Sequence, residues 1–106
     1  MSVTLYGTAS TEKEGRDIAK KLLSNKLIAC ANIFPITSIF FWDNKLQEEL
    51  EVGIIMKTQD ELVETVIEEF KKLHSYEVPC IVSWQIEKGN QDYLNWISNE
   101  TRVDRD

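Results

Sequence analysis

The middle of the chain, which begins at Ile28 and ends at Thr58, carries the longest strand-like pattern in the sequence. Its first half is rich in β-branched and aromatic residues and contains Pro35, which favours a strand and disfavours a helix. Its second half alternates apolar and polar residues with a period of two, which is typical of a half-buried strand. Asp43 and Asn44 lie between the halves and tolerate a positive φ, so the pattern predicts a long β-hairpin with a two-residue turn.

A two-residue turn also fixes which residues face each other across the hairpin. Trp42 then lies opposite Lys45 beside the turn, and Cys30 lies opposite Lys57 at the far end. The far pairing depends on Pro35, because a proline often marks a bulge and each bulge shifts the register by one residue.

The hairpin is longer than a domain of this size covers with its own helices. Its arms are about twice the usual strand length of ~5–6 residues, and the first arm ends in Phe40, Phe41 and Trp42. An exposed apolar arm aggregates or packs against another subunit. We therefore expect a homo-oligomer whose main contact is the segment from Ile28 to Thr58.

Two amphipathic helices are predicted, one before the hairpin and one after it. Thr11 with Glu14, and Thr58 with Glu61, have the spacing of a capping box, in which threonine and glutamate satisfy the first helical N–H groups. Asn25 fits a left-handed residue at the end of the first helix. The apolar stripes are Ile18, Ala19, Leu22 and Leu23 in the first helix, and Leu62, Val63, Val66, Ile67, Phe70 and Leu73 in the second.

Two further alternating segments, residues 3–6 and 80–87, predict a first and a fourth strand. A short helix that Asn90 caps follows, and we expect the polar residues 99–106 to fray. The order of strand, helix, strand, strand, helix, strand and helix predicts an α+β, ferredoxin-like split βαβ sandwich with an extra C-terminal helix, as one domain over residues 1–106. The face of the sheet without the two long helices is expected to be covered by the last helix and by other subunits.

Length and charge narrow the classes of partner. The chain has 106 residues, with 18 acidic and 12 basic side chains and a net charge of -6. This charge disfavours nucleic acid and anionic membranes as partners and weakly favours cations. The chain has no apolar run of the ~20 residues that span a membrane, and its first residues lack the features of a signal peptide. We therefore expect a cytoplasmic protein.

Candidate chemistry is sparse, and several site classes are disfavoured. The third strand lacks the basic and aromatic residues of an RNA-stacking motif, and the loop 7–10 lacks the arginine of an acyl-phosphate cradle. Nothing near His74 supports a Cys–His nucleophile with Cys30 or Cys80. A metal or small-ligand site remains: a site in which His74, a cysteine and a carboxylate converge would favour copper. A surface histidine and two buried cysteines are the simpler interpretation.

Several segments together resemble the CutA family of divalent-cation-tolerance proteins over nearly the whole chain. They are residues 25–32, 38–42 and 57–58, the run His74-x-Tyr76-Glu77-Val78-Pro79, and Gly89-Asn90-x-x-Tyr93-Leu94-x-Trp96. The resemblance implies a homotrimer, similar in outline to PII signalling proteins, in which long hairpins clasp the neighbouring subunits. It also implies binding of copper or another divalent ion and a role in metal tolerance, with no obligatory cofactor and no settled catalytic activity.

Carried over by position, the resemblance places certain residues in clefts between subunits. The ligand-cleft residues are Cys30, Trp42, Lys57, Tyr76 and Glu77, and the metal-ligand candidates are His74, Cys30 and Cys80. Cys80 stands where the family usually has an acidic residue, which shifts the expected preference toward softer ions such as copper or zinc.

Three functional hypotheses follow from the sequence. The first is a cytoplasmic, trimeric, metal-responsive binding protein. The second is a PII-like regulatory or scaffold trimer that binds a small anionic metabolite or a partner protein, with Lys57 as the charge anchor. The third, an enzyme that uses Glu77 with Tyr76, has no positive support, and we expect no catalytic activity.

Overall fold

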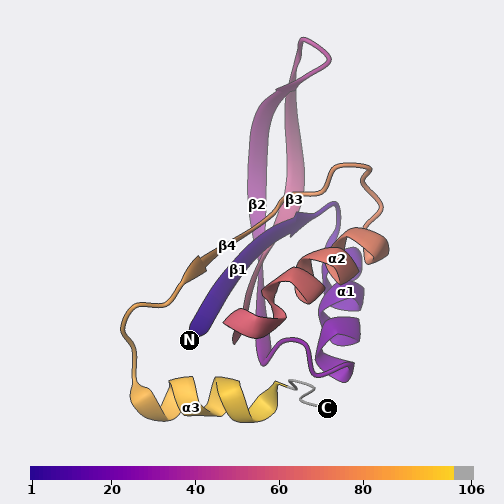
Figure 1. The fold of residues 1–106 in the computed structure, drawn as a ribbon. Helices are drawn as coiled ribbons and strands as arrows, with labels where there is room; N and C mark the ends of the chain where they lie inside the picture. Colours follow the sequence, from indigo (N-terminus) through magenta and orange to yellow (C-terminus); the bar gives the residue numbers. More distant parts are fainter. Residues whose placement is uncertain (102–106) are drawn as a thin grey trace.

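A computed structural model describes residues 1–101 of the chain. The elements follow in the order β1 (Ser2–Ala9), α1 (Glu12–Ser24), β2 (Cys30–Trp42), β3 (Lys45–Gln59), the short 3-10 helix η1 (Asp60–Leu62), α2 (Val63–Leu73), β4 (Ile81–Gln85) and α3 (Gln91–Glu100). The strands form one sheet in the order β2-β3-β1-β4, and every neighbouring pair is antiparallel. This topology confirms the predicted ferredoxin-like fold with an added C-terminal helix (Figure 1).

The core lies between the sheet and the two helices α1 and α2, which pack on the same face of it (Figure 1). Side chains of alternate residues in β1 and β3 meet the apolar stripes of both helices, as the sequence predicts. The largest fully buried members are Leu5, Ile54 and Met56 from the sheet and Ile18, Leu22, Val66 and Phe70 from the helices. Gly7 must lack a side chain, because a Cβ there would lie 2.6 Å from the Phe70 ring.

The β2–β3 hairpin extends well beyond the body of the molecule (Figure 1). Asp43 and Asn44 form its turn with φ of 51° and 62°, values that a type I′ turn requires. The ladder runs unbroken from Trp42 opposite Lys45 to Cys30 opposite Lys57, so the predicted register is confirmed and Pro35 causes no bulge. Pro35 is accommodated because β2 is the edge strand and antiparallel pairing turns the nitrogen of every second residue away from the partner strand.

The helix ends differ from the predictions in three places. The Thr11 hydroxyl accepts the Glu14 N–H at 3.1 Å, but the Glu14 side chain bonds Ser10 instead of closing the box. Thr58 caps nothing, because it is fully buried in β3 and donates to the Leu27 carbonyl at 2.6 Å. The left-handed residue after α1 is Lys26, with φ of 60°, and not Asn25.

The C-terminal part of the described chain covers one end of the open sheet face. The Asn90 side chain accepts the Asp92 N–H at 3.0 Å and caps α3, as predicted. Residues 99 and 100 belong to α3, so the prediction that they fray is wrong; residues 102–106 lie outside the described part. β4 (Ile81–Gln85) is shorter than the predicted strand 80–87, and β1 (Ser2–Ala9) is longer than the predicted strand 3–6. Within residues 1–101, no helix has the length and apolarity to cross a membrane.

Candidate functional site

A groove of about 670 Å³ opens on the sheet face away from α1 and α2. Its walls are the outer half of the hairpin and the connection between α2 and β4, and its floor is the end of β1. It is lined by the apolar and aromatic residues Tyr6, Phe40, Trp42, Tyr76 and Val78, by Glu49, Glu51 and Glu77, and by Thr8, Ser38, Gln47 and Cys80. The groove therefore contains four of the residues that the sequence singled out: Trp42, Tyr76, Glu77 and Cys80.

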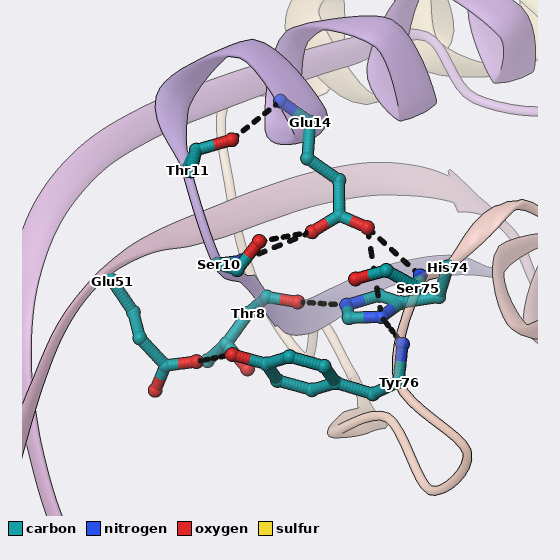
Figure 2. A network of polar contacts seen from close by, with 8 residues as sticks. All are labelled: Thr8, Ser10, Thr11, Glu14, Glu51, His74, Ser75 and Tyr76. Carbon is teal, nitrogen blue, oxygen red and sulfur yellow. Dashed lines mark hydrogen bonds and ion pairs between the residues drawn. The ribbon is translucent and has the colours of Figure 1, made fainter.

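Tyr76 and Glu51 form the central polar contact of the groove. The Tyr76 hydroxyl donates to Oε2 of Glu51 at 2.6 Å. Burial, and then the hydrogen bond to the Glu51 carboxylate, raise the pKa of Tyr76, so the phenol stays protonated as the donor. Glu51 is only 9 % exposed, and its Oε1 accepts no hydrogen bond from residues 1–101 (Figure 2). Nothing in the sequence marks Glu51 as a site residue, because it is one of several polar residues on an alternating strand.

His74 lies behind Tyr76 and is buried, so the expectation of a surface histidine is wrong. Its Nδ1 accepts the Tyr76 backbone N–H at 3.0 Å, which leaves Nε2 to donate to the Thr8 carbonyl at 2.7 Å. Both ring nitrogens are therefore bound, and neither offers a lone pair to a metal ion in this state. His74 instead attaches the α2–β4 connection to β1 (Figure 2).

Glu14 holds the same connection from the helix side (Figure 2). Its Oε1 accepts the N–H and the hydroxyl of Ser10 at 3.1 and 2.7 Å, and its Oε2 accepts the Ser75 N–H at 2.8 Å. Burial opposes ionisation, but the hydrogen bonds from Ser10 and Ser75 outweigh it and lower the pKa of Glu14 to about 2. The ionised Glu14 carboxylate therefore holds the start of the α2–β4 connection, which forms one wall of the groove.

The two cysteines lie in different surroundings and both are free. Cys30 is partly exposed and Cys80 is exposed, so the expectation of two buried cysteines is wrong. Burial, and then the negative charge of Glu51, raise the pKa of Cys80, which keeps its thiol protonated in the groove. Cys30 lies at the other end of the open face under α3, with its Sγ 3.3 Å from the Tyr93 hydroxyl. The hydrogen bond with Cys30, followed by burial, raises the pKa of Tyr93 to about 12, and the Lys57 ammonium lies 5.8 Å from the centre of the same ring.

The predicted site residues therefore separate into two groups in one subunit. Trp42, Tyr76, Glu77 and Cys80 line the groove, whereas Cys30 and Lys57 lie beside α3. Among the described residues, no group of three or more histidine, cysteine, aspartate or glutamate side chains is placed to hold a metal ion. A metal site built from His74, Cys30 and Cys80 does not form in a single subunit, and for an assembled protein it stays a prediction.

The comparisons with known proteins identify the family. The model of the CutA1 divalent ion tolerance protein family matches residues 3–100. The chain belongs to the CutA1 family. The resemblance that the sequence motifs indicated is therefore confirmed, and with it the general connection to divalent-cation tolerance.

Individual relatives match over almost their full length. The divalent-cation tolerance protein CutA of Archaeoglobus fulgidus is 45% identical over 93 residues, which are 88% of this chain and 91% of that protein. The CutA protein of Pyrococcus horikoshii is 37% identical over 100 residues, which are 94% and 98% of the two chains. Among solved structures, CutA1 from Oryza sativa has a TM-score of 0.94 at 36% identity, covering 97% of this chain and 95% of that one.

Proposed function

We propose that this CutA1 family member is a homotrimeric, non-catalytic protein of the cytoplasm that binds a divalent metal ion of the copper type and contributes to metal tolerance. The observation that carries the proposal is the family match over residues 3–100. The cytoplasmic location rests on the sequence alone, and the solved structure from Archaeoglobus fulgidus is that of a periplasmic divalent cation tolerance protein.

The exposed face of the hairpin supports the assembly. Ile39, Phe41, Leu46 and Leu50 share the hairpin face opposite to the groove side and are all largely exposed. A contiguous apolar patch of this kind is typical of a surface that another subunit covers. Since a long hairpin reaches past its own domain, it is suited to clasp a neighbouring copy of the chain.

The thiols are the better metal-ligand candidates in such an assembly. His74 uses both ring nitrogens within its own subunit, whereas Cys30 and Cys80 are accessible and lie on the open face of the sheet. Thiol sulfur favours copper and zinc over harder ions. Because burial and Glu51 raise the pKa of Cys80, metal binding there has to displace the thiol proton.

Native mass spectrometry of the untagged protein, with and without stoichiometric copper, tests both parts of the proposal. We expect a trimer that takes up about one ion per subunit, with uptake reduced in Cys30→Ser or Cys80→Ser. His74→Gln serves as the comparison variant and should retain uptake where it folds. A monomer would contradict the assembly, and a trimer with unchanged uptake in both cysteine variants would contradict the thiol ligands.

One observation favours a second candidate, the PII-like regulatory trimer. The Lys57 ammonium lies over the Tyr93 ring on the open face and forms no ion pair with a carboxylate among residues 1–101. Such a cation suits an anionic metabolite or an acidic partner segment. A thermal shift that a small anionic metabolite produces, and that Lys57→Met abolishes, would favour this candidate over metal uptake.

A further inference from the structure

The sheet face away from α1 and α2 carries opposite charges at its two ends. The groove end has the carboxylates of Glu49, Glu51 and Glu77, and no lysine or arginine is found among its described lining residues. The other end has Lys57, which lies opposite Cys30 in the ladder and forms no ion pair among residues 1–101. Each end of the face therefore keeps its own charge.

The two charges on β3 are too far apart to neutralise each other within one subunit. Glu49, Glu51 and Lys57 have the same parity in this strand and share the open face of the sheet. Lys57 follows Glu51 by six positions and Glu49 by eight. At the usual rise of a strand, these separations are about 20 and 27 Å, which exceeds the reach of a lysine side chain. An ion pair between the two ends therefore needs a second copy of the chain.

The surroundings of Lys57 have the character of a surface that another protein covers. Trp84 on β4 is 52% exposed and lies in the same row of the sheet as Lys57, because both are register partners of Thr4. On α3, the Tyr93 ring centre lies 5.8 Å from the Lys57 ammonium, and both Tyr93 and Trp96 are exposed. Large apolar side chains gathered on one face indicate an interaction surface, and this one is continuous with the hairpin of the proposed assembly.

A copy of the chain that covers this face has to neutralise its charges. A charge that an interface takes out of water destabilises the assembly unless an opposite charge meets it. In a cyclic assembly, one patch of each copy contacts a different patch of the next, so every groove can meet one lysine. The strands contain two lysines, Lys45 and Lys57. Lys45 is exposed beside the hairpin turn, whereas Lys57 is partly buried beside Tyr93, and Lys57 is therefore the cation that needs a partner.

We propose that, in the assembled protein, the groove of each subunit receives the Lys57 ammonium of a neighbouring copy, which pairs with Glu49. Glu51 and Glu77 add negative charge around this pair. The occupant of the groove is thus a second copy of the chain, which completes the groove lining. This inference rests on the homo-oligomer of the proposed function and not on metal uptake. It also leaves Lys57 without a free charge for the anionic metabolite of the second candidate function.

An exchange of the two charges tests the contact through the dissociation constant of the assembly, measured by sedimentation velocity over a series of concentrations. Lys57→Glu and Glu49→Lys should each raise this constant about tenfold or more, because each brings like charges together. The double variant restores opposite charges between copies and should return the constant to within about threefold of the parent. Since the two residues lie about 27 Å apart in one subunit, no contact within a subunit accounts for such a rescue.

Two control pairs have the same net charge as the double variant. Glu64 is exposed on α2, on the other side of the sheet, so Lys57→Glu with Glu64→Lys should stay as weak as Lys57→Glu. Lys45→Glu with Glu49→Lys should stay as weak as Glu49→Lys. If Lys57→Glu does not fold, Lys57→Met and Glu49→Gln form a milder cycle, in which the double variant should lose less affinity than the sum of the single losses.

The results separate this inference from the proposed function. Single variants that assemble like the parent, a double variant without rescue and with additive losses in the milder cycle, or equal rescue by either control pair would overturn the Lys57–Glu49 contact alone. A monomeric parent would contradict both this contact and the proposed assembly. A rescue in a protein that takes up no copper would support the contact and contradict only the metal part of the proposed function.

Discussion

His74 is the side chain that connects the groove wall to the sheet. The α2–β4 connection has no regular ladder to satisfy its backbone, and a buried N–H without a partner is costly. The His74 imidazole supplies a partner for this backbone, because it accepts the Tyr76 N–H and donates to the Thr8 carbonyl. Its ring centre lies 4.8 Å from that of Tyr76 and 5.3 Å from that of Phe70. A histidine that sequence motifs associate with ligands thus acts first as a structural bridge, and it places the Tyr76 hydroxyl where Glu51 accepts it.

Glu14 gives a prediction that depends on pH. Its folded pKa of about 2 lies below the ordinary 4.5, so its charged form stabilises the fold above pH 4.5, and this contribution is lost as the pH falls toward 2. At pH 7, Glu14→Gln should lower the free energy of unfolding by about 2–3 kcal/mol, and the loss should shrink at pH 3. Chemical denaturation at pH 7, 5 and 3, at one protein concentration, measures the difference.

Glu12→Gln is the control for this prediction. Glu12 lies in the same first turn of α1, but its side chain is well exposed and, within residues 1–101, forms an ion pair with Arg16 alone. Its replacement should change the stability by no more than about 0.5 kcal/mol at any of these pH values. A loss in Glu14→Gln that does not change with pH would contradict the assigned role of its charge.

Within a single helix or hairpin, the sequence pattern predicts the features that residues close together in the chain determine. The hairpin register follows from a period of two and a two-residue turn, so it is readable from residues 28–58 and is confirmed throughout. The prediction that Thr58 caps the second helix is wrong, because Thr58 still belongs to β3, which continues to Gln59. Its hydroxyl donates to the Leu27 carbonyl instead. The Glu14–Ser75 and Tyr76–Glu51 contacts join residues 61 and 25 positions apart, and no local pattern indicates such pairs.

The left-handed residue Asn44 in the hairpin turn is expected to control the stability of the hairpin tip. Asn44 has a φ of 62°, a conformation that costs most residues with a Cβ roughly 1–2 kcal/mol but costs glycine nothing. Asn44→Ala should therefore loosen the tip and speed amide hydrogen exchange in residues 36–51 by about fivefold. Asn44→Gly should exchange no faster than the parent. Equal exchange in the alanine and glycine variants would show that the left-handed turn does not control the stability of the tip.

In the whole molecule, the β2–β3 hairpin contributes to two surfaces, the groove on one face and an exposed apolar patch on the other. Residues of one parity, among them Trp42 and Glu49, face the groove, whereas those of the other parity, among them Phe41 and Leu50, form the exposed apolar face. Because a strand turns successive side chains to opposite faces, the two surfaces can change independently. A substitution on the exposed apolar face therefore replaces no side chain of the groove.

Leu50→Glu tests whether the exposed apolar face forms the contact between subunits. Leu50 is 82% exposed in the subunit, so the substitution costs little in folding, but burying a leucine at an interface contributes about 1.5–3 kcal/mol. One buried carboxylate per subunit should shift the assembly to smaller species at micromolar concentration in sedimentation velocity experiments, whereas Gln91→Glu, which adds the same charge on α3, should not. An assembly that tolerates Leu50→Glu would place the subunit contact elsewhere, because no interface core accepts an unpaired charge without loss of affinity.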